Sequence, residues 1–297
     1  MDFNKAIEFA TSSSTYINLN TITAAPTVGT PFSGYVVESI SYANASIGGF
    51  TGPLAQRDGL EADIALIGPR QVQMVVQVYG SSEADLYDKL NDISSAMAPY
   101  PSFASSVDGF RDLRFSQSTI SNTAYSSTGV IPLRMRLRPT SIPNYNLSND
   151  LVTARTSDRG VSTKAAITLL AKDPRKLAQT ATTGSISVSA STTSSTTVTN
   201  SGNYNAYPVL TIVNASASSQ TATISSSLWT SVVVLPASST VTLDSEDRFV
   251  KIGTTLRMDL VSGTSTGFPY LVSGANTITV SALTSVTITY SFFGAWL

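Results

Sequence analysis

The residues that most often carry out chemistry in proteins are scarce in this chain. Its 297 residues contain no histidine and no cysteine. A Ser-His-Asp or Cys-His nucleophile system, histidine metal ligands, thiolate zinc sites and disulfides are therefore excluded. Carboxylates, arginines and aromatic rings remain, and each has a chemical interpretation beside a purely structural one.

Acidic residues gather at two places. Asp244, Glu246 and Asp247 in LDSEDRFV could hold Ca²⁺ through oxygen ligands, but the spaced ligands and the glycine of an EF-hand loop are missing. The second group consists of Arg57, Asp58, Glu61 and Asp63. It could form an acid–base pair of carboxylates, although Asp-Gly is first a turn dipeptide. We interpret both groups as solvated turns and predict no catalytic residue, no metal site and no cofactor.

Three arginines alternate with apolar residues in VIPLRMRLRP. Arg134, Arg136 and Arg138 share one side of the predicted strand, and Leu133, Met135 and Leu137 share the other. Such a strand is half buried and has a basic face. This face could bind phosphate or the carboxylates of a partner. Because interleaved aromatic residues are missing, a salt-bridged subunit face is favoured over a nucleic-acid site.

Aromatic residues of the C-terminal part have two interpretations. Tyr204, Trp229 and Tyr270 could stack on sugar rings if they were exposed. In a β-sandwich, however, aromatic side chains more often fill the core or close strand ends.

One helix is predicted over about 82–98. Leu86, Leu90, Ile93 and Met97 recur at helical spacing, Ser82 can cap the first turn, and Pro99 ends the segment. Before the helix, Asp58-Gly59 and Gly68-Pro69 are turn signals around two runs of alternating residues. These runs predict a β-hairpin from Glu61 to Gly80, covered by the apolar side of the helix.

Short strands dominate the remainder of the chain. VLTIV, TATIS, SVVVL, TVTLD, NTITV and VTITY follow one another between Asn, Ser, Gly and Pro residues, which is typical of a β-sandwich or jelly roll. The Ser/Thr-rich tract before them is predicted to be partly strand, with a loop at STTSSTT. Charged residues make up only 12% and the net charge is -1, so no general field attracts nucleic acid.

The predicted fold is mainly β with one substantial α-helix. We expect an N-terminal α+β domain over 1–160 and a C-terminal β-sandwich over 161–297, to which strands from the 161–170 region contribute. The chain opens without a basic segment followed by an apolar one, which predicts synthesis without a secretion signal.

Taken in order, these segments resemble the distal tail proteins of siphophages, a family that also occurs in gene transfer agents. In the N-terminal part the resemblance rests on QRDGLEADIALIGPRQVQMVVQVYGSSEADLYDKLNDISSAMAP. In the C-terminal part it rests on ITLLAKDPRKL, NSGNYNAYPVLTI, DSEDRFVKI, FPYLVSGANTITV and VTITYSFFGAWL. The Gly-Asn-Tyr…Tyr-Pro strand entry, the Gly-Ala-Asn-Thr-Ile loop and the terminal Trp are the more distinctive features.

The resemblance implies a structural virion protein rather than an enzyme. It implies a homohexameric ring at the distal end of the tail tube, with N-terminal belt domains forming the ring and galectin-like sandwiches projecting outward. Arg134, Arg136 and Arg138 are then expected to face a neighbouring subunit or the lumen of the ring. Its expected partners are the tail tube protein, the tail hub or fibre protein and the tape-measure protein, with DNA passing through the ring without sequence-specific binding. The expected location is the virion tail tip, after assembly in the host cytoplasm and without membrane insertion.

A carbohydrate-binding adhesin or receptor-binding module is the alternative from another class. It would use Tyr204, Trp229 or Tyr270 as its stacking platform. A metal enzyme built on the Asp244 group is a third hypothesis, which predicts metal-dependent stability and activity.

Overall fold

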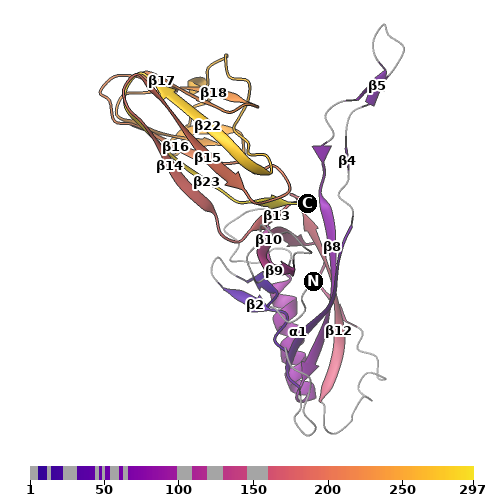
Figure 1. The fold of residues 1–297 in the computed structure, drawn as a ribbon. Coiled ribbons are helices and arrows are strands. Elements are labelled where there is room, and N and C mark those ends of the chain that lie inside the picture. Colours follow the sequence, from indigo (N-terminus) through magenta and orange to yellow (C-terminus); the bar gives the residue numbers. More distant parts are fainter. Residues whose placement is uncertain are drawn as a thin grey trace. The chain divides into compact units, whose positions relative to one another are not determined.

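The chain divides into two compact units, Met1–Arg175 (unit 1) and Lys176–Leu297 (unit 2), each described by itself. The computed structural model describes residues 6–11, 15–22, 32–43, 47–48, 51–53, 60–62, 66–98, 109–118, 130–145 and 160–297. Within these residues the chain is mainly β, with the single α-helix α1 (Figure 1). The predicted fold class is therefore confirmed.

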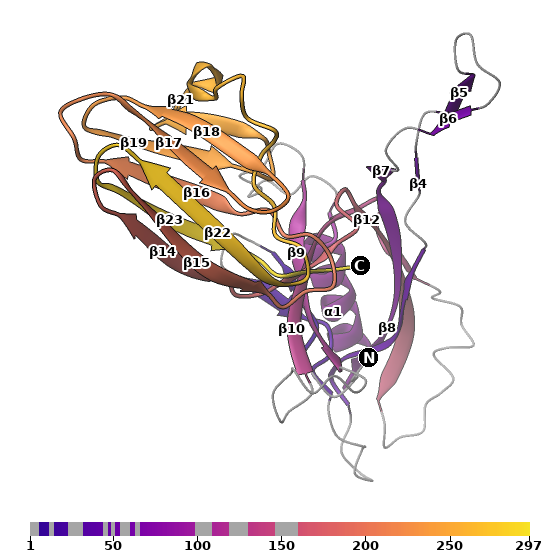
Figure 2. The same cartoon turned by 45° about the horizontal axis from the view of Figure 1, so that its top comes forward.

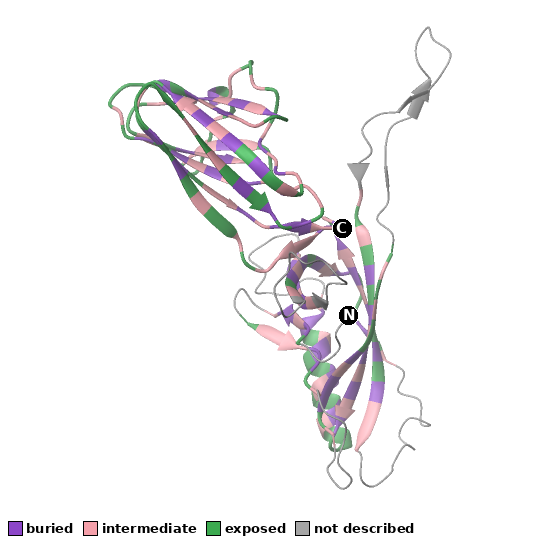
Figure 3. Ribbon diagram, viewed as in Figure 1, coloured by how far each residue is buried: buried purple, intermediate pink, exposed green. Residues whose placement is uncertain are grey.

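Unit 1 is built on an antiparallel sheet in the strand order β2-β1-β9-β10-β12-β8-β3. In that order the strands are Tyr16–Asn18, Glu8–Ala10, Arg111–Ser118, Val130–Pro139, Val161–Ala171, Arg70–Gly80 and Gly34–Tyr42. The short β11 (Asn144–Tyr145) also pairs with β12. Along β8 and β12 buried and more exposed residues alternate, so that one face of the sheet is apolar (Figure 3).

Four short strands between β3 and β8 in the sequence form two further pairs, which we call the ribbon. β4 (Ile47–Gly48) pairs with β7 (Leu66–Ile67), and β5 (Thr51–Pro53) pairs with β6 (Leu60–Ala62) (Figure 2). The predicted hairpin was therefore wrong in its pairing, since Gly68-Pro69 joins β7 to β8 along the same side of the ribbon. Alternation marked β8 as a strand, but it carries no information on the partner. β3 supplies that partner and buries Val37 beside β8.

Helix α1 (Glu83–Ala96) lies against β8 and β12. As predicted, Ser82 caps it, with its Oγ accepting a hydrogen bond from the Asp85 amide at 3.2 Å. The apolar side of the helix, which includes Leu86, Leu90 and Ile93, is buried. Burying a side chain of this size stabilises the fold by roughly 1.5 to 3 kcal/mol. The helix prediction is confirmed, with the end at Ala96.

Unit 2 is a sandwich of two antiparallel sheets. One sheet has the order β14-β23-β16-β19-β20-β21, with the bounds Thr182–Val188, Val286–Phe292, Val209–Asn214, Ser239–Asp244, Phe249–Ile252 and Thr255–Leu256. The other has the order β15-β22-β17-β18, with the bounds Thr192–Asn200, Gly274–Ala282, Gln220–Ser225 and Thr230–Leu235. A 3-10 turn, Met258–Leu260, follows β21, and β13 (Lys176–Ala178) pairs with β24 (Ala295–Trp296).

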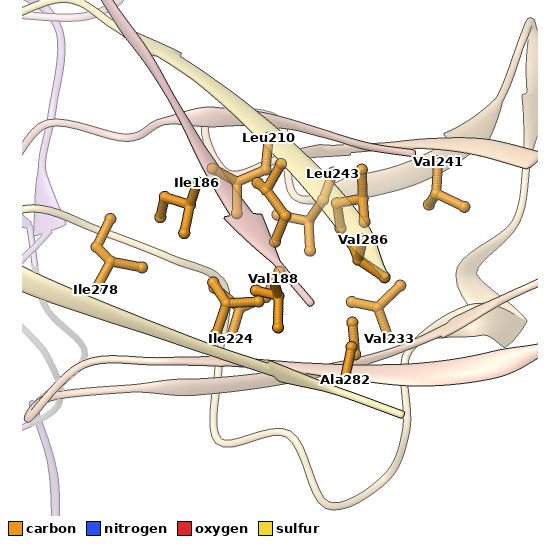
Figure 4. Close-up of a cluster of buried hydrophobic side chains, with 14 of the residues drawn as sticks. Ile186, Val188, Leu210, Ile224, Val233, Val241, Leu243, Ile278, Ala282 and Val286 are labelled. Atoms are coloured by element: carbon orange, nitrogen blue, oxygen red, sulfur yellow. The ribbon is translucent and has the colours of Figure 1, made fainter. Parts of the chain in front are cut away.

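The two sheets of unit 2 share one apolar core. Ile186, Leu210 and Val286 of the first sheet point toward Ile224 and Ile278 of the second (Figure 4). Such face-to-face packing of two sheets defines a β-sandwich, and this part of the prediction is confirmed.

The boundary between the two units differs from the sequence prediction. All eleven residues of β12 pair with β8, from Val161 opposite Gly80 to Ala171 opposite Arg70. Residues 161–171 therefore lie in unit 1, and the two units divide after Arg175 rather than after residue 160. Local pattern identified this strand but could not assign it to a sheet, because the paired residues of β8 lie about eighty to a hundred positions earlier in the chain.

The predicted loop at STTSSTT is a strand. β15 runs through it and pairs with β22, and Ser195 Oγ lies 3.0 Å from Thr279 Oγ1 across the pair. Thr is a good strand former, and Val198 anchors the strand in the core. The polarity of the tract thus reflects an exposed strand face.

Candidate functional site

The three predicted arginines lie on β10 as the alternation required. Leu133, Met135 and Leu137 are buried on one side of the strand. On the other side Arg136 is exposed, and Arg134 and Arg138 are half buried. The predicted half-buried strand with a basic side is confirmed, whereas a role for these arginines remains a prediction.

The three arginines of β10 lie beside the neighbouring strand β9 or beside Phe110, the residue that precedes β9. Arg136 is in register with Asp112, and Arg134 Nη1 lies 3.1 Å from Asp112 Oδ2. The Arg138 guanidinium lies 5.2 Å from the centre of the Phe110 ring. Sequence reasoning missed Asp112. The alternation in RDLRFS places Asp112 and Arg114 on one side of a strand, but it does not show that this strand pairs with β10.

A fourth arginine extends this surface toward β1. Arg114 is in register with Arg134 on one side and with Glu8 on the other, and its guanidinium lies 4.0 Å from the centre of the Tyr16 ring. We call this surface the arginine face. It consists of Arg114, Arg134, Arg136 and Arg138 together with the carboxylates of Glu8 and Asp112.

α1 carries four carboxylates, and those of Glu83, Asp88 and Asp92 are exposed. They do not share one side of the helix, because five residues separate Glu83 from Asp88 and turn the chain by about 140°. Asp85 instead pairs with Lys89 one turn later at 3.3 Å. Two hydrogen bonds from Ser81, one from its amide, together with the bond from Lys89, lower the pKa of Asp85 to about 2.

The end of α1 is held by a buried arginine. Arg111 of β9 donates hydrogen bonds to the carbonyl oxygens of Ala96 and Ala98, and its guanidinium lies 4.7 Å from the centre of the Phe9 ring. Burial lowers the pKa of Arg111 to about 10. Arg111 is therefore still protonated at neutral pH and caps the negative end of the helix.

Trp229 belongs to the core of unit 2. Its side chain is 3% exposed, and its indole Nε1–H donates to the Tyr270 carbonyl oxygen at 2.7 Å. Tyr270 is half buried against the same core, and Tyr204 is half buried beside β24. The suggestion that Trp229 forms a sugar-stacking surface is therefore wrong, because a buried ring cannot contact a ligand in solvent.

The acidic group at Asp244 forms a turn between β19 and β20. Asp244 Oδ1 accepts hydrogen bonds from the amides of Glu246 and Asp247 at 3.0 and 3.1 Å. This arrangement explains the residue types through local backbone bonding. Of the other predicted acidic group, Arg57, Asp58 and Asp63 lie outside the described residues, and only the backbone of Glu61, in β6, is described.

None of the helices in the part of the chain that the structure describes has the length and apolar character needed to cross a bilayer.

Comparison with known proteins agrees with this architecture. Residues 201–292 match the family described as siphovirus-type tail component, C-terminal domain. The SPP1 Dit (gp 19.1) protein, described as a paradigm of the hub adsorption apparatus in phages infecting Gram-positive bacteria, has a similar fold. Its TM-score is 0.51 at 14% identity, over 86% of this chain and 92% of that one.

A second solved structure is more distant. A chain of the phage p2 baseplate in its activated conformation with Sr gives a TM-score of 0.41 at 7% identity, over 96% of this chain and 97% of that one. No curated protein sequence matches the chain.

The fold and the family match of residues 201–292 agree with a component of a siphovirus-type tail. The resemblance to siphophage distal tail proteins is confirmed, and residues 201–292 are a siphovirus-type tail component domain.

Proposed function

We propose that this chain forms a homohexameric ring at the distal end of a phage tail tube. Unit 1 builds the ring, and unit 2 supplies the outward domain. The ring joins the tube protein to the tail hub or fibre protein and contacts the tape-measure protein. DNA passes through it without base-specific contacts.

This proposal is supported by two matches that agree, one to a protein family and one to a solved structure. Residues 201–292 match the C-terminal domain of siphovirus-type tail components, and the fold of most of the chain resembles that of SPP1 Dit, although identity is only 14%. Unit 1 adds a physical argument. Among the described residues the strand order of its sheet ends in β3 and β2, and assembly with identical neighbours is one way in which proteins cover such edges.

The proposed role requires binding rather than turnover. Its place is the tip of the virion tail, after synthesis in the host cytoplasm. The low charge content and the absence of histidine and cysteine are compatible with a structural role.

Light scattering across a concentration series, followed by electron microscopy, tests the ring. We expect particles of six times the chain mass of 31.2 kDa, with a central opening. If purified tail tubes are added, the rings should cap one end of each tube. A protein that stays monomeric and leaves tube ends bare would overturn the proposal. Saturable glycan binding by such a monomer would favour the adhesin instead.

A further inference from the structure

We infer that β15 of one copy pairs with β15 of a second copy, so that two copies of this chain are joined through unit 2. β15 is the edge of the sheet β15-β22-β17-β18, and within the described part of the chain no strand pairs with its outer side. The inference goes beyond the proposed ring, because it concerns a contact that closing the ring does not need.

The opposite edge of the same sheet is already covered. There the chain that follows the 3-10 turn runs along β18, and the amides of Ser262 and Thr266 donate to the carbonyl oxygens of Val232 and Thr230 at 2.9 and 2.8 Å. In return, the amides of Val232 and Thr230 donate to the hydroxyl oxygens of Ser265 and Thr266. Backbone groups that a further strand would use are therefore occupied on β18.

β15 has none of the features that usually protect an edge strand. Charged side chains, proline and β-bulges discourage pairing with another chain. Thr192–Asn200 contains no charged residue and no proline, and all nine residues pair with β22 in an unbroken register. About half of the backbone N–H and C=O groups of such a strand point away from its sheet, and an added strand can pair with them.

Charge repulsion does not oppose a second copy on this side of the sandwich. Apart from Lys176, every charged side chain of unit 2 lies between Asp244 and Asp259, at the opposite end of the strand order from β14. β14 is the edge strand of the other sheet, lies beside β15 (Figure 2) and is also uncharged. The two strands on this side therefore present only uncharged side chains.

The composition of β15 makes it complementary to itself. Every residue from Ser191 to Thr197 is Ser or Thr, and the facing residues of β22 are of the same kind. Ser195 Oγ, for example, lies 3.0 Å from Thr279 Oγ1 across the pair. A second β15, antiparallel and centred near Ser195, also sets hydroxyl side chains opposite hydroxyl side chains, and such cross-strand pairs are stabilising.

This pairing is two-fold and differs from the contact that closes a ring. Both copies use the same strand, whereas a ring of six needs two different patches on each copy. Pairing through β15 therefore links copies that belong to two rings. Because the contact is one strand wide, we expect it at high protein concentration.

Lysines on the exposed side of β15 test the contact, because like charges then face each other across the two-fold axis. Light scattering should show the particle mass of the unmodified chain doubling as concentration rises, and Thr193→Lys with Thr197→Lys should abolish the doubling. Glutamates at the same two positions should also abolish it, and mixing the two variants should restore it. Lysines at Thr221 and Thr277, exposed on the inner strands β17 and β22, are the control and should leave the doubling intact.

Introduced thiols report the register, because the chain has no cysteine. Thr193→Cys, Ser195→Cys and Thr197→Cys are oxidised singly and in mixtures. A pairing centred on Ser195 links Ser195→Cys to itself, and a shift of the centre by one residue links it to one of the other two. The yield should exceed that of Thr277→Cys about fivefold, since residues on β22 of the two copies are separated by about 14 Å.

Disulfide yields at the control level in every mixture would overturn the contact, and so would a doubling that the lysines of β15 leave unchanged. If rings form and cap tail tubes but never pair, the proposed function stands and the β15 contact fails. If the mass instead doubles from one chain to two and the lysines abolish this step, the contact stands and the proposed ring fails.

Discussion

Arg111 Nη2 donates a hydrogen bond to the Ala98 carbonyl oxygen at 2.8 Å, so that β9 caps the helix that ends just before it. The same guanidinium also bonds to the Ala96 carbonyl oxygen and lies over the Phe9 ring. One buried side chain thus joins strand, helix and core within unit 1.

Replacing this guanidinium should destabilise unit 1. Arg111→Met leaves two helix-terminal carbonyl oxygens without their donor, and we expect the free energy of unfolding to fall by about 2 to 3 kcal/mol. Helical circular dichroism during urea unfolding reports this change, because α1 belongs to unit 1. Arg136→Met, at an exposed position on the neighbouring strand, should change stability by less than about 0.5 kcal/mol. Equal losses in both variants would refute the capping role.

The Asp85 carboxylate should make unit 1 sensitive to acid. Hydrogen bonds, the largest from the Ser81 amide, lower its pKa in the folded state to about 2, below the ordinary value of about 3.9. The stabilisation is therefore complete above pH 4 and disappears as the pH falls from about 4 to about 2.

Asp85→Asn checks this assignment. The variant should be less stable than the unmodified chain by roughly 1 kcal/mol at pH 5, a value that allows for solvent screening of a partly exposed group. The difference should close near pH 2 in urea titrations followed by circular dichroism. Asp88→Asn, on the exposed side of the same helix, is the matched control. If the two chains still differ in stability at pH 2, the loss of stability in Asp85→Asn does not come from the carboxylate charge.

Trp229 should contribute to stability and not to ligand binding. Trp229→Phe removes the donor for the Tyr270 carbonyl oxygen and leaves space in the core, at a cost of about 1 to 3 kcal/mol. The remaining Trp296 also lies in unit 2, so tryptophan fluorescence follows the unfolding of this unit in urea. Trp296→Phe, at a half-buried position, should cost less. An unchanged unfolding midpoint in Trp229→Phe would contradict a core role.

A negative charge at position 214 should destabilise unit 2. Asn214 Nδ2 donates to the carbonyl oxygens of Ser218, Leu235 and Pro236 at 2.8 to 3.3 Å, and the side chain is buried. Asn214→Asp sets a buried carboxylate against these oxygens, and we expect unit 2 to lose about 3 kcal/mol or more.

The exposed Asn203 provides the control for that variant. Its Oδ1 only accepts a hydrogen bond, from the Leu297 amide at 3.1 Å, and a carboxylate can accept the same bond. Asn203→Asp should therefore unfold at nearly the same urea concentration as the unmodified chain. If both variants lost similar stability, the added charge alone would explain the loss, and the three carbonyl contacts of Asn214 would not.

Local pattern in the sequence was sufficient for α1, for the two sides of β10 and for the family likeness. The spacing from Leu86 to Met97 and the cap at Ser82 predicted α1, and the alternation in VIPLRMRLRP placed three arginines on one side of β10. These features depend only on residues close in the chain, because helical and strand periodicities are local properties. Each segment on which the family resemblance rests is likewise a short stretch of neighbouring residues.

Tertiary structure decided which distant segments meet. It paired β8 with β3 and β12, placed residues 161–171 in unit 1, turned the Ser/Thr tract into an edge strand and buried Trp229. It also brought Asp112 and Arg114 beside the arginines of β10. Alternation identifies the two sides of a strand but names no partner, since pairing is selected by packing over the whole domain. The sequence alone therefore determined α1, the two sides of β10 and the family likeness, and the tertiary structure determined which strands pair and which side chains are exposed.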